Sequence, residues 1–209
     1  MLSDERAPVR RPPDYPSLDD EALVRLLVQQ DVRALEALYQ RYSRPVFSLA
    51  LKILGDREVV EEVVQEVFLR LWTRAQGYDA ERGKLLSWLL TITHHRAIDE
   101  LRRRRTQPET DGLQEQLAAA EEPGGDPATS LAHVEEREAV QRALAQLPPA
   151  QRKPIEMAYY GGMTQVEIAL ALHEPLGTIK TRMRLGMQKL RGLLAGRDED
   201  AQPVGTGAV

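Results

Sequence analysis

The side chains best suited to binding nucleic acid lie near the C-terminal end of the chain, after Pro175. Residues 178–192 include five basic residues and no acidic residue, although the whole chain has a net charge of −4. Lysine and arginine neutralise phosphate and donate to guanine, and threonine hydroxyls contact phosphate or base edges. This pattern predicts a surface that reads duplex DNA. The residues expected to face the DNA are Gly177, Thr178, Lys180, Thr181 and Arg184.

Two short helices joined by a tight turn are expected to position that surface. Thr164 and Glu167 have the spacing of a capping box, which predicts the start of the first helix. His173 lies in the predicted turn, and Pro175 opens the second helix. The arrangement is typical of a helix-turn-helix with its second helix in the major groove, and the alternative is a solvated hairpin with a basic rim. The stripe predicted to be buried on the second helix is Ile179, Met183, Met187 and Leu190.

A second basic stretch spans residues 82–105, with seven basic residues against two acidic ones, and ends in four consecutive arginines. Positive charge together with aromatic rings is typical of proteins that bind single-stranded nucleic acid, although Trp88 alone also fits a core position. His94 and His95 are adjacent, so on a helix they point about 100° apart and do not form a metal site. A helix is predicted over 85–105, with a buried stripe of Leu85, Leu89, Ile92, Ala97 and Leu101.

Three further helices are predicted before the basic stretch. The first covers residues 18–30 and starts at Ser17 or Asp19, and the second covers 33–54, with Pro45 as a kink or a join between two helices. The third, capped near Asp56, runs to Trp72 because paired apolar residues recur every four positions. The stripe of this third helix is Val59, Val60, Val63, Val64, Val67, Phe68, Leu71 and Trp72. Its outer face, with Glu61, Glu62, Gln65, Glu66, Leu69 and Arg70, has solvation as its simplest explanation.

An acidic stretch separates two helical halves. Residues 106–138 include nine acids and one base, with several prolines and glycines, which favours a flexible linker over 106–130. Helices are predicted again over 131–146 and 149–160. Residues 1–17 and 196–209 are predicted to be flexible tails. The expected fold is therefore all-α, with two small helical domains and a helix-turn-helix in the second.

Composition excludes several classes of protein. The chain has no cysteine, so disulfides, thiolate zinc sites and cysteine nucleophiles are excluded. No apolar run approaches the length of a membrane span, and the N-terminus lacks the apolar core of a signal peptide, so a cytoplasmic location is expected. No nucleophile–base set, glycine-rich phosphate loop or metal spacing is present, which argues against an enzyme, a cofactor and a small-molecule substrate.

Three blocks of sequence resemble the extracytoplasmic-function (ECF) sigma factors, the smallest class of the bacterial sigma-70 initiation factors. The first block is Val-Val-Glu-Glu-Val-Val-Gln-Glu-Val-Phe-Leu-Arg-Leu-Trp, over residues 59–72. The second comprises Tyr-Asp-Ala-Glu-Arg-Gly over 78–83, Ser-Trp-Leu-Leu-Thr-Ile over 87–92 and Arg-Ala-Ile-Asp-Glu-Leu-Arg-Arg-Arg-Arg over 96–105. The third comprises Leu-Pro-Pro-Ala-Gln-Arg over 147–152, Tyr-Gly-Gly-Met-Thr-Gln-Val-Glu-Ile-Ala over 160–169 and Gly-Thr-Ile-Lys-Thr-Arg-Met over 177–183.

The resemblance implies a role for each block. The first block would dock on the clamp helices of the polymerase β′ subunit, through Glu62, Gln65, Glu66, Leu69 and Arg70. The second would recognise and melt the −10 element, with a flipped base near the 77–84 loop and with Arg82, Trp88, His95, Arg96, Asp99, Arg102 and Arg103 on the DNA. The third would read the −35 element through the five residues from Gly177 to Arg184 given above.

The resemblance also implies domain limits and partners. Residues 18–105 would form the region 2 domain and residues 131–195 the region 4 domain, joined by the linker. The expected partners are core RNA polymerase, including its β flap, promoter DNA, and an anti-sigma factor of the kind that is often membrane-bound. One position departs from the family: His173 occupies a turn position that is usually glycine and that requires positive φ.

Two other classes compete with this interpretation. An ordinary helix-turn-helix regulator would bind duplex DNA without polymerase, but it would not explain the 59–72 helix or the block around Trp88. An enzyme is the third class, and the sequence offers no chemistry for it. Binding to core polymerase distinguishes a sigma factor from an ordinary helix-turn-helix regulator.

Overall fold

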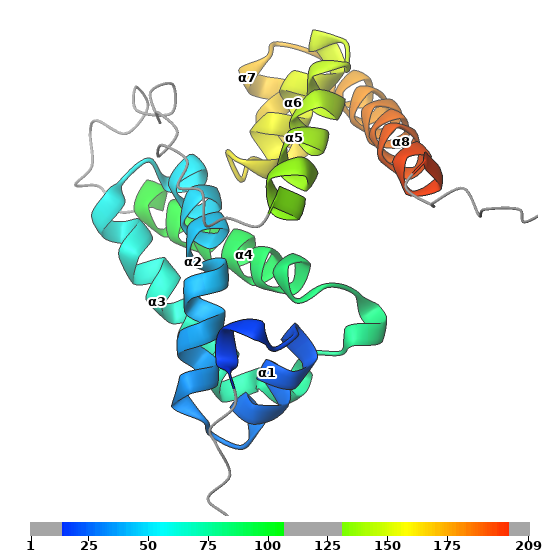
Figure 1. Cartoon of the computed structure of the whole chain (residues 1–209). Helices are drawn as coiled ribbons and strands as arrows, with labels where there is room; N and C mark the ends of the chain where they lie inside the picture. The colour runs from blue at the N-terminus through cyan, green and yellow to red at the C-terminus, as the bar shows by residue number, and fades with distance from the viewer. Residues whose placement is uncertain (1–13, 107–130, 201–209) are drawn as a thin grey trace, which may run out of the picture.

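The protein is described here by a computed structural model, which covers residues 14–106 and 131–200. Within these ranges every regular element is helical, and the elements form two bodies (Figure 1). The predicted acidic linker and most of both predicted tails lie outside the described residues. No described helix has both the length and the apolar character needed to cross a bilayer. The all-α, two-domain prediction is confirmed.

The N-terminal domain contains the four long helices α1 (Asp20–Val28), α2 (Val32–Leu54), α3 (Arg57–Arg74) and α4 (Leu85–Thr106). An aspartate caps each of the first three, because its carboxylate satisfies a backbone N–H that has no partner in the first turn. Asp19 accepts from Ala22 N at 2.7 Å, and Asp31 and Asp56 cap α2 and α3 in the same way. Asp19, rather than Ser17, is therefore the start of α1.

Helix α2 runs without a break through Pro45, so the predicted join between two helices is wrong. Gly55 ends α2 in the left-handed conformation, with φ 69°, and Asp56 begins α3 at once. Two short 3-10 turns, η2 (Ala75–Gly77) and η3 (Ala80–Arg82), form the connection between α3 and α4. This connection includes the 77–84 loop in which the resemblance places the flipped base.

The last residues of the predicted N-terminal tail are folded onto the domain. They form the 3-10 turn η1 (Tyr15–Ser17), and the Tyr15 hydroxyl donates to Asp31 at 2.6 Å. This bond ties the turn to the start of α2, which a purely compositional prediction does not detect. The rest of that tail lies outside the described residues.

The C-terminal domain contains α5 (Leu131–Ala145), α6 (Pro149–Tyr159), α7 (Gln165–Ala171) and α8 (Leu176–Asp200). The capping box predicted for α7 is present in both directions: Glu167 N donates to Thr164 Oγ1 at 3.2 Å, and Thr164 N donates to Glu167 at 2.6 Å. Helix α8 continues to Asp200, five residues into the segment predicted to be a tail.

Most of the predicted core positions are buried. The paired apolar residues of α3 face the core, with Val59 and Trp72 only partly covered, and α4 adds Leu86, Thr93 and Ile98 to its predicted stripe. On α8, Ile179 and Leu190 are buried and Met183 is partly covered, but Met187 is exposed. The prediction for Met187 is wrong because its neighbour Gly186 faces α6 instead, with its Cβ position 2.6 Å from Cδ1 of Ile155.

Candidate nucleic-acid interface

The first candidate surface lies on the N-terminal half of α8. Gly177, Lys180 and Thr181 are exposed, as is Arg184, and Thr178 is partly exposed. They lie opposite Ile179, which is fully buried against α7. The Thr181 hydroxyl donates to the carbonyl of Gly177 at 2.9 Å, so it can still accept a hydrogen bond from outside the helix. All five predicted positions are thus accessible on one helix that can enter a groove.

The turn between α7 and α8 fixes the orientation of that helix. His173 has φ 53°, the left-handed conformation that the sequence led us to expect there. Glu174 N donates to the carbonyl of Ala169 at 3.0 Å, and the Glu174 carboxylate accepts from Arg182 at 2.5 Å. Arg182 therefore tethers α8 to the turn.

The second candidate surface follows the exposed side of α4. His95, Asp99 and Arg102 are exposed at spacings of four and three residues, so they form one row along the helix. Arg103 is also exposed, but Glu100 holds its guanidinium with two bonds of 2.8 Å. These bonds lower the pKa of Glu100 below its ordinary value, with the hydrogen bond from Arg103 as the main cause.

Two arginines of α4 connect this helix to α3. Arg104 donates to Asp56 at 2.8 Å, and this bond is the main reason why the pKa of Asp56 is lowered. Arg96 forms an ion pair with Glu66. Arg104 is thus a structural clamp. The contact between Arg96 and Glu66 joins one residue predicted to bind DNA to another predicted to bind polymerase.

The loop before α4 borders an open cleft of about 640 Å³. Tyr78 lies in this loop, and its ring centroid is 6.1 Å from that of Trp88, which packs partly buried against the core. Partial burial raises the pKa of Tyr78. Arg82 projects from the loop, paired with Asp79 at 3.1 Å. The residues that line the cleft are Asp19, Asp20, Glu21, Arg41, Tyr42, Tyr78, Ala80, Gly83, Lys84 and Leu86.

A third surface, the outer face of α3, is exposed throughout. Leu69 is an apolar residue that is nevertheless 61% exposed, between charged neighbours. An isolated exposed leucine is ordinary, but a leucine on a charged face is also what a docking site for another protein requires. The residues of this face are Glu62, Gln65, Glu66, Leu69 and Arg70.

Comparison with known proteins matches both domains. Residues 38–107 match the Sigma-70 region 2 family and residues 137–190 match the Sigma-70 region 4 family. The chain is similar to the ECF RNA polymerase sigma factor SigK of Mycobacterium tuberculosis, with 37% identity over 182 residues that cover 85% of this chain and 95% of the relative. The SigK of Mycobacterium sp. (strain KMS) is 34% identical over 187 residues, covering 90% and 95%.

The chain belongs to the ECF sigma factors. It therefore directs core RNA polymerase to promoters and initiates transcription. Among solved structures, Rhodobacter sphaeroides SigE in complex with the anti-sigma ChrR matches with 31% identity and a TM-score of 0.42, over 82% of this chain and 96% of that one. CnrH in complex with the cytosolic domain of CnrY matches with 21% identity and a TM-score of 0.38, over 85% and 97%.

Sequence reasoning missed two features of this sigma factor. The cleft depends on Asp20, which accepts from Arg41 at 2.7 Å and from the Tyr42 hydroxyl at 2.5 Å. Burial is the main cause that raises the pKa of Tyr42. The second missed feature is a set of contacts between the domains, centred on Tyr159 and His94. The adjacent tyrosines before a glycine pair were the one available signal for it.

Proposed function

We propose that the N-terminal domain of this sigma factor, residues 18–105, binds and opens the −10 element along the exposed side of α4. The row formed by His95, Asp99 and Arg102 carries this proposal, because a single row of polar and basic side chains can follow one strand. Arg103 and Arg96 lie beside the row and reach phosphate once their carboxylate partners release them. The protein acts here by binding, without catalysis of its own.

The 77–84 loop supplies the complementary part of strand opening. A base that leaves the stack needs a cleft with an aromatic wall, and the cleft beside Tyr78 offers both. The partly buried Trp88 ring packs beside that of Tyr78, and the exposed Arg82 is available for phosphate. Strand separation then follows from preferential binding of the unpaired strand.

The C-terminal domain, residues 131–195, is proposed to read the −35 element with α8. Lys180 and Arg184 donate to guanine or phosphate, and Thr178 and Thr181 contact bases or phosphate near them, beside the backbone of Gly177. The outer face of α3 is proposed to dock on the β′ clamp helices, with Leu69 as its apolar contact. The β flap and an anti-sigma factor, which could be membrane-bound, are further proposed partners, and the proposed location is the cytoplasm.

In vitro transcription with core polymerase over a promoter library tests the −35 assignment. Replacing Lys180 and Arg184 together by alanine should reduce transcription by roughly tenfold or more, since a good base contact contributes about 1–3 kcal/mol. Lys189 and Arg191, on the same helix but outside the proposed surface, are the matched alanine control. Equal activity of the two double variants would refute the assignment of the reading surface.

Polymerase docking is tested separately, by the affinity of the full chain for core. Gln65→Ala with Leu69→Ala should weaken binding, whereas Arg57→Ala, at the exposed start of the same helix, should leave it unchanged. An unchanged affinity of the first variant would place the docking face elsewhere. Failure of the wild-type chain to bind core at all would instead favour an ordinary helix-turn-helix regulator.

A further inference from the structure

The end of α6 and the loop that follows it contact the N-terminal domain through two adjacent tyrosines, Tyr159 and Tyr160. The Tyr159 ring is stacked on the ring of His94, with centroids 4.2 Å apart and planes inclined by 24°. Nε2 of His94 lies 2.8 Å from the Tyr159 carbonyl oxygen. Because a carbonyl oxygen only accepts, Nε2 must be the protonated nitrogen and donates this bond. One histidine of α4 is therefore engaged twice by the other domain.

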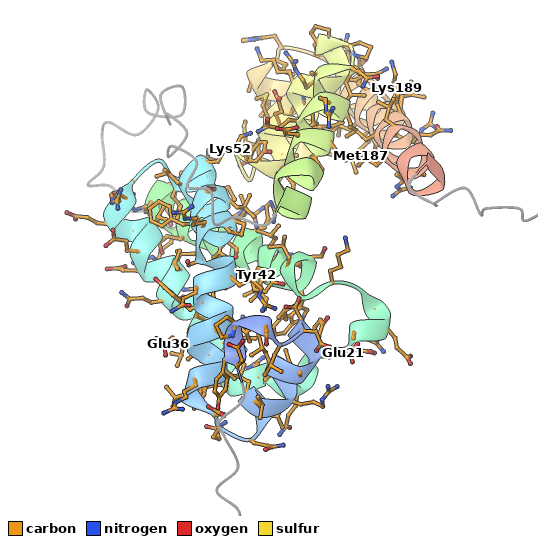
Figure 2. The ribbon with its side chains drawn as sticks, viewed as in Figure 1. Glu21, Glu36, Tyr42, Lys52, Met187 and Lys189 are labelled. Atoms are coloured by element: carbon orange, nitrogen blue, oxygen red, sulfur yellow. The ribbon has the colours of Figure 1, made fainter. Side chains whose placement is uncertain are left out.

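The next residues of the loop extend the contact along α4 and onto α2. Lys52 Nζ lies 4.2 Å from the centroid of the Tyr160 ring, a cation–π geometry, and Tyr160 packs against the N-terminal core. Arg102 donates to the carbonyl oxygen of Gly162 at 3.1 Å. Figure 2 shows Lys52 at the end of α2 that faces the C-terminal domain.

The backbone at Gly162 is adapted to this close approach. Its φ is 60°, and a Cβ at this position would lie 3.1 Å from Cγ2 and 3.2 Å from Cδ1 of Ile98. Only glycine adopts that conformation without strain and also leaves room for Ile98. The loop thus lies directly against the surface of α4, with its backbone carbonyls available to His94 and Arg102.

Charge complementarity continues beyond the loop. Glu167, at the start of α7, has a pKa below its ordinary value mainly because Thr164 donates to it. The charges of Arg105 and Arg102 lower the pKa of Glu167 further, so the charges of this carboxylate and of the arginines at the end of α4 attract each other. The phosphates of a bound strand would interact with the same arginines.

We propose that residues 159–162 form an intramolecular latch that covers part of the −10 surface in the free sigma factor. The latch and an open DNA strand compete for Arg102 and for the side of α4 that holds His94, so strand binding requires the domains to separate. This inference rests on the proposed role of α4. The chain itself is the occupant of the surface: the Arg102 side chain is still exposed, but its guanidinium already donates to the carbonyl of Gly162.

The contacts are few enough for the latch to open. A surface cation–π contact and a few hydrogen bonds are individually weak, because each replaces an interaction with water. The linker keeps the two surfaces at high effective concentration, so a weak contact is still formed most of the time. When only a fraction of the molecules is competent, the apparent affinity for the strand falls by that fraction. A latch closed in most molecules therefore lowers apparent strand affinity by up to roughly tenfold.

The latch can be measured in the full chain because the sequence has no cysteine. Cysteines introduced at the exposed positions Glu61 and Gln188 accept a fluorescent donor and acceptor, one in each domain. Replacing Lys52 and Tyr159 by alanine should lower the energy transfer, because it removes the cation–π contact and the stacked ring. The matched control is Arg25→Ala with Met187→Ala, since Met187 is as exposed as Tyr159, at 43% each, and neither control residue lies in the contact.

The functional readout is the affinity of the free protein for a mixed-sequence single-stranded DNA of fixed length. The Lys52 and Tyr159 double variant should bind severalfold more tightly than wild type, although it has lost a positive charge, and the control should not. If the double variant has the same energy transfer as wild type, the latch does not form in solution. If its energy transfer falls but its affinity for the strand is unchanged, the latch does not mask the −10 surface. Arg102→Ala, introduced into the Lys52 and Tyr159 double variant in which the latch is already open, tests the underlying role. If strand affinity does not fall in that background, the −10 assignment fails while the latch, measured by energy transfer, remains.

Discussion

The two domains of this sigma factor are both helical, but their cores differ in kind. In the N-terminal domain one cluster of 24 buried hydrophobic residues, from α1 to α4 and from η2, is built around α2. Among the described side chains of the C-terminal domain, the buried residues fall into two clusters of four and three, and partly covered Met183 contacts both. The first domain is stabilised mainly by a large hydrophobic core, and the second by a few close contacts, helix caps and turns.

That difference suits the role proposed for each domain. The proposed melting of a promoter requires a rigid side of α4, and α4 packs on both α2 and α3 with its row of polar residues outside. Reading a groove requires only one well-oriented helix, and α8 is oriented by its packing on α6 and by the Arg182 tether to the turn. A small domain has little buried apolar area, so each contact represents a larger share of its stability.

The largest expected effect comes from emptying one core position in each domain. Leu89 and Ile168 are both fully buried, and replacing either by alanine should cost about 2–5 kcal/mol. The N-terminal domain should remain folded at 37 °C after Leu89→Ala, whereas the C-terminal domain should lose most of its structure after Ile168→Ala. Differential scanning calorimetry of the full chain checks this, and one shared transition that moves equally in both variants would contradict the comparison.

The next largest effect tests the close contact between α6 and α8, which stabilises the C-terminal domain in place of a large core. Gly186→Ala places a methyl group 2.6 Å from Cδ1 of Ile155 and 3.3 Å from Cβ of Gln151, so α6 and α8 must separate or repack. We expect a loss of roughly 1–3 kcal/mol.

Gly192, on the same helix, is the matched control for Gly186. A Cβ at Gly192 meets nothing within 4 Å, so Gly192→Ala should be neutral or should stabilise the helix by up to about 1 kcal/mol. Urea unfolding of the two variants gives both values. Equal effects of the two substitutions would show that the contact between α6 and α8 is not tight in solution.

Much of the fold could be predicted because its determinants are local. Asp56 and Thr164 cap helices through bonds to residues two or three positions ahead, and these patterns are visible in any single sequence. The stripe of α3 was predictable because its spacing repeats without interruption. The prediction for Met187 failed because spacing defines a face but not the position of the partner helix, and at Gly186 that partner comes too close for a side chain.

The candidate site was predictable only in part, for a related reason. Lys180 and Arg184 stand out because a basic run in an acidic chain is itself a signal. The function of each arginine at the end of α4 depends on distant residues: Arg104 is clamped by Asp56, 48 positions earlier, and Arg102 donates to Gly162, 60 positions later. No spacing rule covers such separations, so a single sequence identifies the cluster but not the role of each member.

Lowering the pH should destabilise the N-terminal domain more than the C-terminal domain. Asp31, Asp56 and Glu100 have pKa values below their ordinary values, chiefly through hydrogen bonds from Tyr15, Arg104 and Arg103 respectively. The unfolded chain therefore binds more protons than the folded one in this range, and the stability from these bonds, present at neutral pH, is lost as pH falls through and below the ordinary values of 3.8 and 4.5.

The described part of the C-terminal domain has one carboxylate with such a lowered pKa, Glu167. We expect the melting temperature of the N-terminal domain to fall more steeply between pH 6 and about pH 3.5, and Arg104→Gln to reduce that slope. Melting curves across this range, followed separately for the two transitions, provide the measurement. A steeper fall in the melting temperature of the C-terminal domain would contradict the expectation that the N-terminal carboxylates dominate the pH dependence.

The smallest expected effect concerns the two described non-glycine residues with positive φ, one in each domain. Gln30 has φ 64° between α1 and α2, and His173 has φ 53° between α7 and α8. Glycine relieves about 1–2 kcal/mol of left-handed strain at either position, but it costs about 0.5–1 kcal/mol of chain entropy, so the net gain is at most about 1.5 kcal/mol. The same free energy shifts the melting temperature more in the smaller unfolding unit, because the unfolding entropy scales with size. His173→Gly should therefore raise the C-terminal transition by more degrees than Gln30→Gly raises the N-terminal one, and equal shifts would mean that the two domains unfold as one unit.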